Sequence, residues 1–479
     1  MLPGSEKILQ HSYKLHFVKK QQMSLIATDS LKKPTELPPL SQHRVLRYAT
    51  FIVLYFSQGI PEGITIFGIP AWMAMNGKGA AEIASYGAVI MIPFSLKIFL
   101  APFMERYTFL PMGRRRPWML FGQLGIMSSL LALSFVPDPL NNLVLLTTAA
   151  VCVHIFIMFQ DIATDSLVID IVPLQEQGKA NSLMWGSKVV GTSISLALGS
   201  WLINSFGFSF AVSSMAVSIL FFMLAPLLLR ERQGEKLFPW SAGCTSPDAA
   251  LLAIDSWGTL FTSFKQVLLL RNIGLLAITT FIIMAAVHYM RTLLPIFTIQ
   301  GLGWNNVFYA NIYSTTNLAG GILGMITGGI IIFRYGIVRM LQGVLFFAGI
   351  LAGLMAFSGA VWSNNTFVSI FIGCINVLIV LINIAVLALA MQMCWKRISA
   401  LQFTFCMTIF NGALAAGAAL LGDLRNQFGW QTILLIFSVA VFSAMLLLRF
   451  IKVKKHQAQV QELEQNYLNN AKNEHEHNN

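Results

Sequence analysis

The chain alternates long apolar runs with short polar segments along most of its length. A helix needs about 20 largely apolar residues to cross the hydrocarbon core of a bilayer. The runs reach this length, so they predict membrane-spanning helices rather than the core helices of a soluble protein. Twelve spans are predicted, at residues 47–72, 82–105, 117–136, 142–170, 181–204, 208–229, 272–299, 305–333, 338–359, 366–394, 399–423 and 429–451.

The long polar gap after the sixth run divides the spans into two sets of six. This order predicts an all-α polytopic membrane protein with twelve transmembrane helices in a 6+6 pseudo-symmetric arrangement, an outline typical of secondary transporters built from repeats. The predicted domains are an N-terminal tail (1–46), a first six-helix bundle (47–229), a central loop (230–271), a second six-helix bundle (272–451) and a C-terminal tail (452–479).

Two of the polar segments carry a pattern of their own. In the central loop, apolar residues recur at three- and four-residue steps, at Trp257, Leu260, Phe261, Phe264 and Leu268. That spacing predicts an amphipathic helix lying in the membrane interface. The C-terminal tail is polar, and we expect a solvated, disordered end there rather than a metal site at His475 and His477.

The composition supports the membrane assignment. Hydrophobic residues make up 56% of the chain and charged residues only 11%, whereas soluble proteins carry about 25% charged residues. This balance excludes a soluble enzyme, a disordered scaffold and a disulfide-rich secreted protein. The five cysteines have no motif spacing and are predicted to be small core residues. The sequence therefore predicts no cofactor and no metal site.

The net charge of +12 follows the membrane topology. If the N-terminus lies inside, 27 of the 32 Lys and Arg residues fall on the inner side, and only Lys78 and Arg425 fall outside. Cytoplasmic loops carry such an excess of positive residues. The distribution predicts that both termini are cytoplasmic, and it explains the basic charge through the lipid bilayer without a nucleic acid.

Six ionisable side chains fall inside predicted spans, together with two histidines, His154 and His288. Charged groups at this depth are costly and face a cavity or a partner. Since the set holds three acids and three bases, it favours mutual pairing over a channel of fixed charge. The six residues are Glu62, Lys97, Asp161, Asp165, Lys188 and Arg291.

Glu62 lies in the stretch Ser57-Gln-Gly-Ile-Pro-Glu62-Gly63 of the first span. Pro61 removes a backbone hydrogen bond and the flanking glycines allow a bend, so the helix is expected to kink beside this carboxyl group. A bent helix with a carboxyl at mid-depth fits a binding site at the membrane midplane. A kink in which Glu62 is held by a structural partner is the alternative.

Asp161 and Asp165 are four residues apart, so both lie on one face of the fourth span. Two carboxyl groups this close form either a proton relay or a structural cluster neutralised by Lys97 and Lys188. Both readings stay open, with the structural one slightly favoured because cations lie on neighbouring spans.

Arg291 and His288 lie close together in the seventh span. Arg291 has no evident partner within its own span. A guanidinium that faces a cavity suits a carboxylate or phosphate of a solute. Pairing of Arg291 with Glu62 is the alternative.

The loop between the second and third spans reads Pro102-Phe-Met-Glu105-Arg106-Tyr and then Gly113-Arg114-Arg115-Arg116. It resembles the inner-loop motif of the major facilitator superfamily, which implies a gating role for Glu105, Arg106 and the residues Gly113 to Arg116. Residues 334–339 are similar to the weaker echo of this motif in the second half of such proteins.

Three further stretches resemble the AmpG-type branch of that superfamily, which holds muropeptide permeases and acetyl-CoA transporters. They are Pro93 to Pro102, Gln160-Asp161-Ile-Ala-Thr-Asp165, and Ala400-Leu-Gln402-Phe. The resemblance covers about residues 47–450 and leaves both tails outside. Two features depart from it, namely the long basic N-terminal tail and a tenth span that carries no charge.

This resemblance implies proton-coupled uptake of a bulky anionic solute, such as an anhydro-muropeptide, across a bacterial inner membrane. It also implies that the first, fourth, seventh and tenth spans line the cavity. Its pathway residues would then be Glu62, Asp161, Asp165, His288 and Arg291. The implied partners are a small anionic solute and protons, and the protein is expected to be a monomer.

Other functions were weighed against this one. The same spans and motifs fit a carrier of an acyl-CoA thioester, a peptide or a carboxylate siderophore, or an assembly factor or receptor that moves no solute. A polytopic enzyme is disfavoured, because the spans hold no His-x-x-x-His pair and no phosphate-binding glycine loop. An ATP-driven pump is excluded because the chain has no Walker motif.

Overall fold

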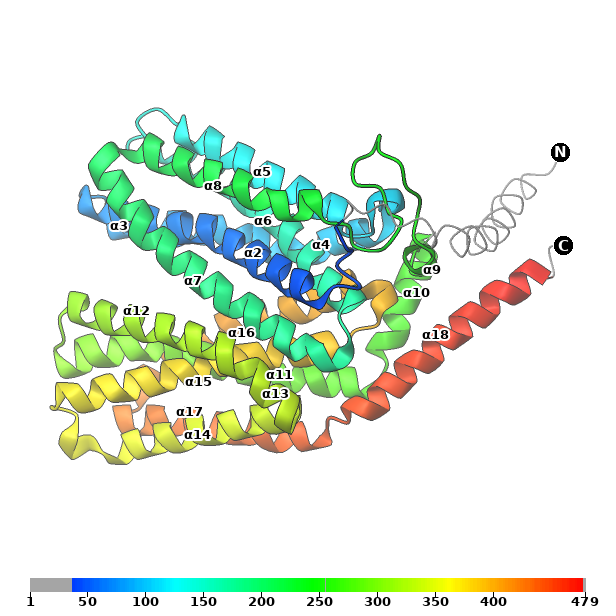
Figure 1. Ribbon diagram of the computed structural model, residues 1–479. Coiled ribbons are helices and arrows are strands. Elements are labelled where there is room, and N and C mark those ends of the chain that lie inside the picture. The colour runs from blue at the N-terminus through cyan, green and yellow to red at the C-terminus, as the bar shows by residue number, and fades with distance from the viewer. Residues whose placement is uncertain (1–36, 255, 477–479) are drawn as a thin grey trace.

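The computed structural model describes residues 37–254 and 256–476, and the regular structure in these ranges is helical. The first 36 residues of the predicted N-terminal tail and His477 lie outside the described residues. The helices, labelled as in Figure 1, are α2 (Arg44–Glu62), η1 (Gly63–Gly68), α3 (Ile69–Met75), α4 (Ala80–Arg106), η2 (Leu110–Met112), α5 (Arg116–Ser134), α6 (Leu143–Ile171), α7 (Leu174–Phe206), α8 (Phe208–Leu228), α9 (Pro247–Leu251), α10 (Trp257–Leu268), α11 (Arg271–Ile296), η3 (Phe297–Gly301), α12 (Asn306–Leu323), η4 (Gly324–Gly328), α13 (Gly329–Tyr335), α14 (Ile337–Phe357), η5 (Gly359–Val361), α15 (Asn365–Gln392), η6 (Lys396–Ile398), α16 (Ser399–Gln427), α17 (Trp430–Leu447), η7 (Leu448–Phe450) and α18 (Val453–Glu476).

Twelve helical segments within the described ranges are long and apolar enough to cross a membrane, which confirms the predicted number of spans. Most of their ends lie within a few residues of the predicted ends. The fifth span is the largest difference, because α7 begins at Leu174 rather than at 181. Pro173 precedes a run of good helix formers there, so the helix starts before the chain becomes apolar.

The spans form two sets that lie side by side in Figure 1. In the first set, α2 packs against α7, α6 against α4 and α5, and α8 against α5. In the second set, α11 packs against α16 and α17, and α15 against α12 and α14. The sets meet where α16 packs against α4 and where α7 packs against α12, α13 and α15. Side chains at that boundary therefore contact helices of both sets.

The first span changes its helical pitch beside Glu62. Pro61 lacks a backbone N–H, and the helix continues after Glu62 as the π-helical turn η1. The glycines of this span allow a close approach to α7, since a Cβ on Gly59 would lie 2.5 Å from the carbonyl oxygen of Lys188. A Cβ on Gly63 would lie equally close, 2.5 Å, from the carbonyl oxygen of Thr192. The kink and the contact together set Glu62 against α7.

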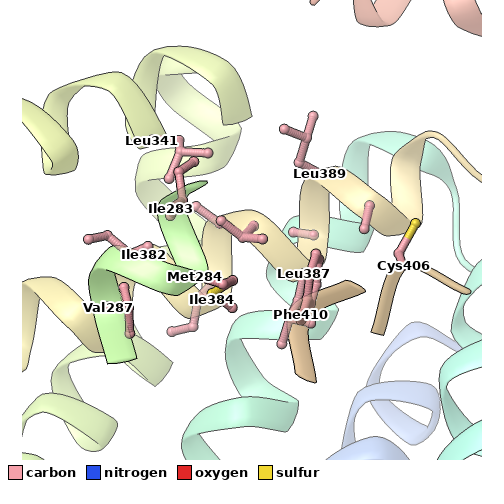
Figure 2. Close-up of a cluster of buried hydrophobic side chains, with 14 of the residues drawn as sticks. Ile283, Met284, Val287, Leu341, Ile382, Ile384, Leu387, Leu389, Cys406 and Phe410 are labelled. Atoms are coloured by element: carbon pink, nitrogen blue, oxygen red, sulfur yellow. The ribbon is translucent and has the colours of Figure 1, made fainter. Parts of the chain in front are cut away.

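The second set has an apolar interior. Figure 2 shows side chains of α11, α14, α15 and α16 packed together, among them Ile283, Leu341, Ile384, Cys406 and Phe410. All five cysteines are free thiols. The prediction that they are core residues is right for the buried Cys394 and Cys406, but Cys152 and Cys374 are exposed on the surface of the bundle.

The amphipathic helix predicted in the central loop is confirmed as α10. Its Leu260 is fully buried, whereas Phe261 on the neighbouring position is 51% exposed. In Figure 1, α9, α10 and α18 gather at one end of the bundle. We call it the basic end, because Arg114, Arg116 and Arg397 also lie there. The opposite end, where α4 and α6 begin, is called the far end.

The expectation of a disordered C-terminal tail is wrong for the described residues, because residues 453–476 form α18. One carboxylate oxygen of Glu464 accepts a hydrogen bond from Arg397 at 2.6 Å. The other oxygen accepts a hydrogen bond from the indole of Trp395 at 2.5 Å. The Arg397 guanidinium also lies 3.7 Å from the ring centroid of Tyr467. These contacts hold α18 against the bundle, although its polar sequence alone predicts a solvated segment.

The contact between Glu464 and Arg397 predicts a measurable stability effect. Glu464→Gln should lower the apparent Tm of the purified protein, because it leaves the buried Arg397 cation without its anion, a loss of about 1–3 kcal/mol. The matched control is Glu462→Gln, which removes an exposed charge from the same helix. Equal Tm values for the two variants would contradict a structural role for this pair.

Candidate functional site

Ionisable side chains gather inside the first set of spans, and all of them are buried except Lys188, which is partly exposed. Each of the four helices α2, α4, α6 and α7 contributes at least one of them, and they include five of the six charges predicted from sequence. The exposed fraction of the acids is at most 8%, and the Lys97 side chain is 3% exposed. We call this group the interior charge cluster; its members are Glu62, Lys97, Asp161, Asp165 and Lys188.

Two ion pairs connect the cluster across four helices. The ammonium group of Lys188 on α7 lies 2.8 Å from a carboxylate oxygen of Glu62 on α2. Lys97 on α4 forms an ion pair with Asp161 on α6. The amide of Gln58 donates a second hydrogen bond to Asp161, at 2.7 Å. Each cation therefore binds one carboxylate, and the pairs stabilise the packing of α2 on α7 and of α4 on α6.

Asp165 differs from the other two acids of the cluster. It accepts a hydrogen bond from the hydroxyl group of Tyr55, and no cation among the described residues lies within ion-pair distance of it. Its exposed fraction is 2%. The cluster consequently holds three carboxyl groups but only two ammonium groups.

The contacts between α2 and α6 form an antiparallel ladder. Tyr55 contacts Asp165, Gln58 contacts Asp161, and further along the same span, in η1, the hydroxyl group of Thr65 lies 2.9 Å from Nε2 of His154. As the residue number rises on the first span it falls on α6 by nearly the same amount, so polar side chains face each other at three levels of the seam. The sequence analysis missed Tyr55, Gln58 and Thr65; their spacing along one face of an apolar helix was the available signal.

Arg291 and His288 do not join the cluster. Arg291 is half-buried on α11, in the second set, and forms no ion pair or hydrogen bond with any described residue. The prediction that the six charges pair mutually is therefore wrong for Arg291, and also for Asp165. Glu62 is paired with Lys188, so Glu62 is not the partner of Arg291.

A second buried group of charges closes the basic end. One carboxylate oxygen of Glu105 accepts hydrogen bonds from Arg114 at 2.6 Å and from Arg115 at 2.7 Å. Asp170, at the end of α6, lies 3.1 Å from each of the same two guanidinium groups. All four side chains are fully buried or nearly so. We call Glu105, Arg114, Arg115 and Asp170 the latch.

The latch connects the first set of spans to the second. Arg114 donates to the carbonyl oxygens of Lys396 at 2.8 Å and of Arg397. In the reverse direction, the backbone N–H of Ala400 donates to Glu105 at 2.6 Å and the hydroxyl of Ser399 donates to Asp170 at 2.7 Å. The start of α16 is thereby bound to the loop between α4 and α5, and the basic end is closed.

The glycine of the predicted gating motif is required by its surroundings. Gly113 has φ +107°, and a Cβ there would lie 2.7 Å from the carboxyl carbon of Glu231. Glu231, in the central loop, accepts the backbone N–H groups of Arg114 at 3.0 Å, Arg115 at 2.7 Å and Arg116. Burial and the nearby Glu231 raise the pKa of Glu235 to about 8. The central loop is therefore part of the closed basic end.

The other two motif arginines do not bind the latch carboxylates. The side chain of Arg116 donates to backbone carbonyl oxygens, among them that of Pro226 at 2.6 Å. The guanidinium of Arg106 lies 5.6 Å from the ring centroid of Tyr107 and outside the latch. The sequence analysis missed Asp170 and Glu231, because charges at span ends and in loops are ordinary in membrane proteins.

A cavity of about 690 Å³ lies between the first turns of α4 and α6, at the far end. Its lining includes Glu82, Ser85, Tyr86, Thr147 and Thr148. The hydroxyl group of Tyr86 donates a 3.0 Å hydrogen bond to the carbonyl oxygen of Thr65. Most of the lining is apolar and includes Val89, Val144 and Val151, but its polar residue Tyr86 contacts Thr65, the residue that lies next to His154.

Relatives of this chain are transport proteins. The anhydromuropeptide permease of Escherichia coli (strain K12) is 25% identical over 406 residues, which cover 82% of this chain and 77% of the permease. The putative transporter AmpG 1 of Rickettsia prowazekii is 22% identical over 439 residues, which cover 83% of this chain and 96% of that protein. These relatives confirm the resemblance to the AmpG-type branch.

Solved structures agree with the fold. The transporter FucP, in the outward conformation, aligns with a TM-score of 0.61 at 14% identity over 85% of this chain and 98% of its own. The human organic anion transporter MFSD10 aligns with a TM-score of 0.59 at 15% identity over 86% of this chain and 100% of its own. The family model described as Major Facilitator Superfamily matches residues 51–418. This chain, with its twelve candidate spans and its arginine-rich loop between α4 and α5, belongs to the Major Facilitator Superfamily of membrane transporters.

Proposed function

We propose that this transporter couples proton entry to the uptake of a bulky anionic solute, such as a muropeptide, across a bacterial inner membrane with both termini in the cytoplasm. The observation that carries the proposal is the surplus carboxyl group of the interior charge cluster. The excess of Lys and Arg in the segments assigned to the inner side supports the orientation.

Charge balance is the physical basis of proton coupling. Net charge in a low-dielectric interior is costly, and two of the three acids in the cluster already have a cation. One proton makes the cluster neutral. Asp165 is the acid on which we place it, since its partner is the hydroxyl group of Tyr55 rather than a cation. Loss of this proton would restore an unbalanced charge and favour a different arrangement of the helices.

Arg291 is the anchor that we propose for the solute. Its guanidinium belongs to the second set of spans and has no partner among the described residues. A planar guanidinium binds carboxylate or phosphate groups in bidentate fashion. The relative named anhydromuropeptide permease supports a muropeptide as the solute. His288, one turn away on α11, lines the same stretch of the pathway in this proposal.

Alternating access would follow from rocking of the bundles formed by 47–229 and 272–451 against each other. The latch holds them together at the basic end, and the central loop at 230–271 supports it through Glu231. Breaking the latch would open a route towards the cytoplasm. The solute would then leave on that side.

The proposed function is tested by uptake of a radiolabelled anhydromuropeptide into proteoliposomes under an imposed pH gradient. A gradient that is acidic outside should drive accumulation. Thermal-shift assays against muropeptides, acyl-CoA thioesters, peptides and carboxylate siderophores identify the solute class, because a ligand that binds the folded state raises its apparent stability. Stabilisation by another class without any muropeptide effect would replace the solute, and uptake that ignores the gradient would exclude proton coupling.

Asp165→Asn should uncouple transport from the proton gradient. The asparagine still accepts the Tyr55 hydrogen bond but makes the cluster neutral without a proton. Uptake driven by the gradient should fall by about 5- to 150-fold, the range of ordinary coupling free energies, while exchange of solute across the membrane is retained. Asp423→Asn, which alters an exposed aspartate, is the control. Undiminished driven uptake in Asp165→Asn would rule out this residue as the coupling acid.

Asp170→Asn should open the basic end. Removing one buried anion from a paired network costs about 3–5 kcal/mol, and here it weakens only the closed state. Spin labels at the exposed positions Phe109 and Arg339 should show a larger share of long distances in the variant. Arg106→Gln, in the same motif but outside the latch, should leave the distribution unchanged. An identical distribution in Asp170→Asn would contradict the latch.

Arg291→Lys should weaken solute binding far more than folding. Lysine keeps the charge but loses the bidentate fork, and we expect roughly a tenfold increase in Kd. Calorimetry with the ligand found in the thermal-shift screen measures this change, and Arg334→Lys, at an exposed arginine, is the control. An unchanged Kd would remove Arg291 from the binding site.

A further inference from the structure

We propose that His154 is the side chain through which protons enter the interior charge cluster from the far end. The inference rests on the proton coupling proposed above, and it adds a residue and a direction to it. Three observations carry it: the position of His154 on the ladder, the state of its imidazole nitrogens, and a cavity whose lining residue Tyr86 contacts Thr65.

His154 is the rung of the α2–α6 ladder nearest the far end. It lies seven residues before Asp161 and eleven before Asp165, so the three side chains share one face of α6. The other end of α6 reaches Asp170 in the latch. Since the latch closes the basic end, a proton that reaches the cluster in this conformation comes from the far end, where His154 is met before either aspartate.

The hydrogen bonds around Thr65 fix the tautomer of His154. The single hydroxyl proton of Thr65 is donated to the carbonyl oxygen of Pro61 at 2.6 Å. The 2.9 Å contact between this hydroxyl oxygen and Nε2 of His154 therefore requires that Nε2 carries the imidazole proton. Nδ1 is then a bare acceptor. It is buried without any hydrogen-bond partner, on a side chain that is 0% exposed.

An unpartnered imidazole nitrogen on a fully buried side chain points to a transient ligand. A buried polar atom normally finds a partner, and leaving one unpaired costs about 1–3 kcal/mol. A proton, delivered by a water molecule, satisfies Nδ1 without any rearrangement of the contact between Nε2 and Thr65. The geometry is thus already suited to binding a proton and releasing it again.

The cavity at the far end, which is open to the surface and carries a few polar side chains in a mainly apolar lining, supplies the access. Its lining includes Tyr86, whose hydroxyl group is hydrogen-bonded to the carbonyl oxygen of Thr65. Val151, one turn before His154 on α6, lines the same cavity. Tyr86 is thus the side chain that separates this cavity from the contact between His154 and Thr65.

The charged groups around the imidazole determine where the proton goes next. Three elements present titratable groups to this part of α6, namely α2 with Glu62, α4 with Tyr86 and α7 with Lys188. Residues 117–134 of α5 and 399–422 of α16 carry no charged side chain. An imidazolium without an anionic partner is costly in a buried interior, so the proton added at Nδ1 leaves again. Its acceptor is the carboxylate of Glu62, one helical turn from Thr65, from which the proton can pass along the ladder to Asp165.

His154→Gln tests the proposal. The glutamine amide can still donate to the Thr65 hydroxyl group, but it cannot carry a proton. Radiolabelled anhydromuropeptide is the probe, with gradient-driven uptake and exchange at equal pH measured in the same proteoliposomes. We expect driven uptake to fall at least about fivefold and exchange to stay within about twofold of wild type. His43→Asn, which keeps an acceptor at the exposed N-cap of α2, is the matched control and should leave both unchanged.

The outcomes separate this inference from the proposed function. Wild-type uptake that ignores the pH gradient would defeat the proposed function itself. Coupled wild-type uptake together with equally coupled His154→Gln would defeat only the role of His154. Loss of both exchange and driven uptake in His154→Gln would assign the histidine a structural role and would likewise overturn the inference.

Discussion

The cost of burying charge in a low-dielectric bundle governs the arrangement of the first set of spans. An ion taken out of water without a partner costs several kcal/mol, and a membrane interior offers no solvent to reduce that cost. The pairs Lys97–Asp161 and Lys188–Glu62 meet the requirement, and each pair joins two helices. The close approach of α2 to α7 at Gly59 follows from the same need. In this half of the molecule the ion pairs are also contacts between helices, so a change in the protonation of a paired carboxylate also changes how the helices pack.

The two sets of spans share a helical arrangement but differ in the side chains of their interiors. Both begin with a span in which a proline is followed by a π-helical turn, Pro61 before η1 and Pro295 before η3. Only the first of these turns has an acid beside it. Around α11, α15 and α16 the interior is filled mainly with aliphatic and aromatic side chains (Figure 2), and Arg291 on α11 forms no ion pair or hydrogen bond with any described residue. Proton binding in one set and solute binding in the other is the division of labour that this asymmetry favours.

The segment from Met393 to Ala400 connects three parts of the basic end. Its carbonyl oxygens at Lys396 and Arg397 bind the latch arginine Arg114, and its side chains Trp395 and Arg397 bind Glu464 of α18. Nε2 of His456 lies 2.8 Å from the carbonyl oxygen of Met393, which adds a further contact from α18. The C-terminal helix thus braces the residues that hold the latch. A movement that separated α16 from the loop between α4 and α5 would have to break the contacts of Arg114 or carry α18 with it.

The features that the sequence predicts correctly are those that depend only on the order of residues along the chain. The number of spans, the break in the first span after Pro61 and the membership of five of the six charges follow from the length of apolar runs and from the rarity of charge within them. The pairing of Asp161 with Lys97 was among the predicted alternatives, but the pairing of Glu62 with Lys188 was not, because it depends on how each helix is rotated and on which helices touch. Asp170 and Glu231 were missed because charge at a span end is common, and only three-dimensional contact distinguishes a latch residue from a solvated one. The order of α18 depends on Arg397 and Trp395, some 70 positions earlier, so no local pattern could have revealed it. What the sequence hides in this protein is therefore the set of contacts between helices, and these are also the contacts that must break and re-form during transport.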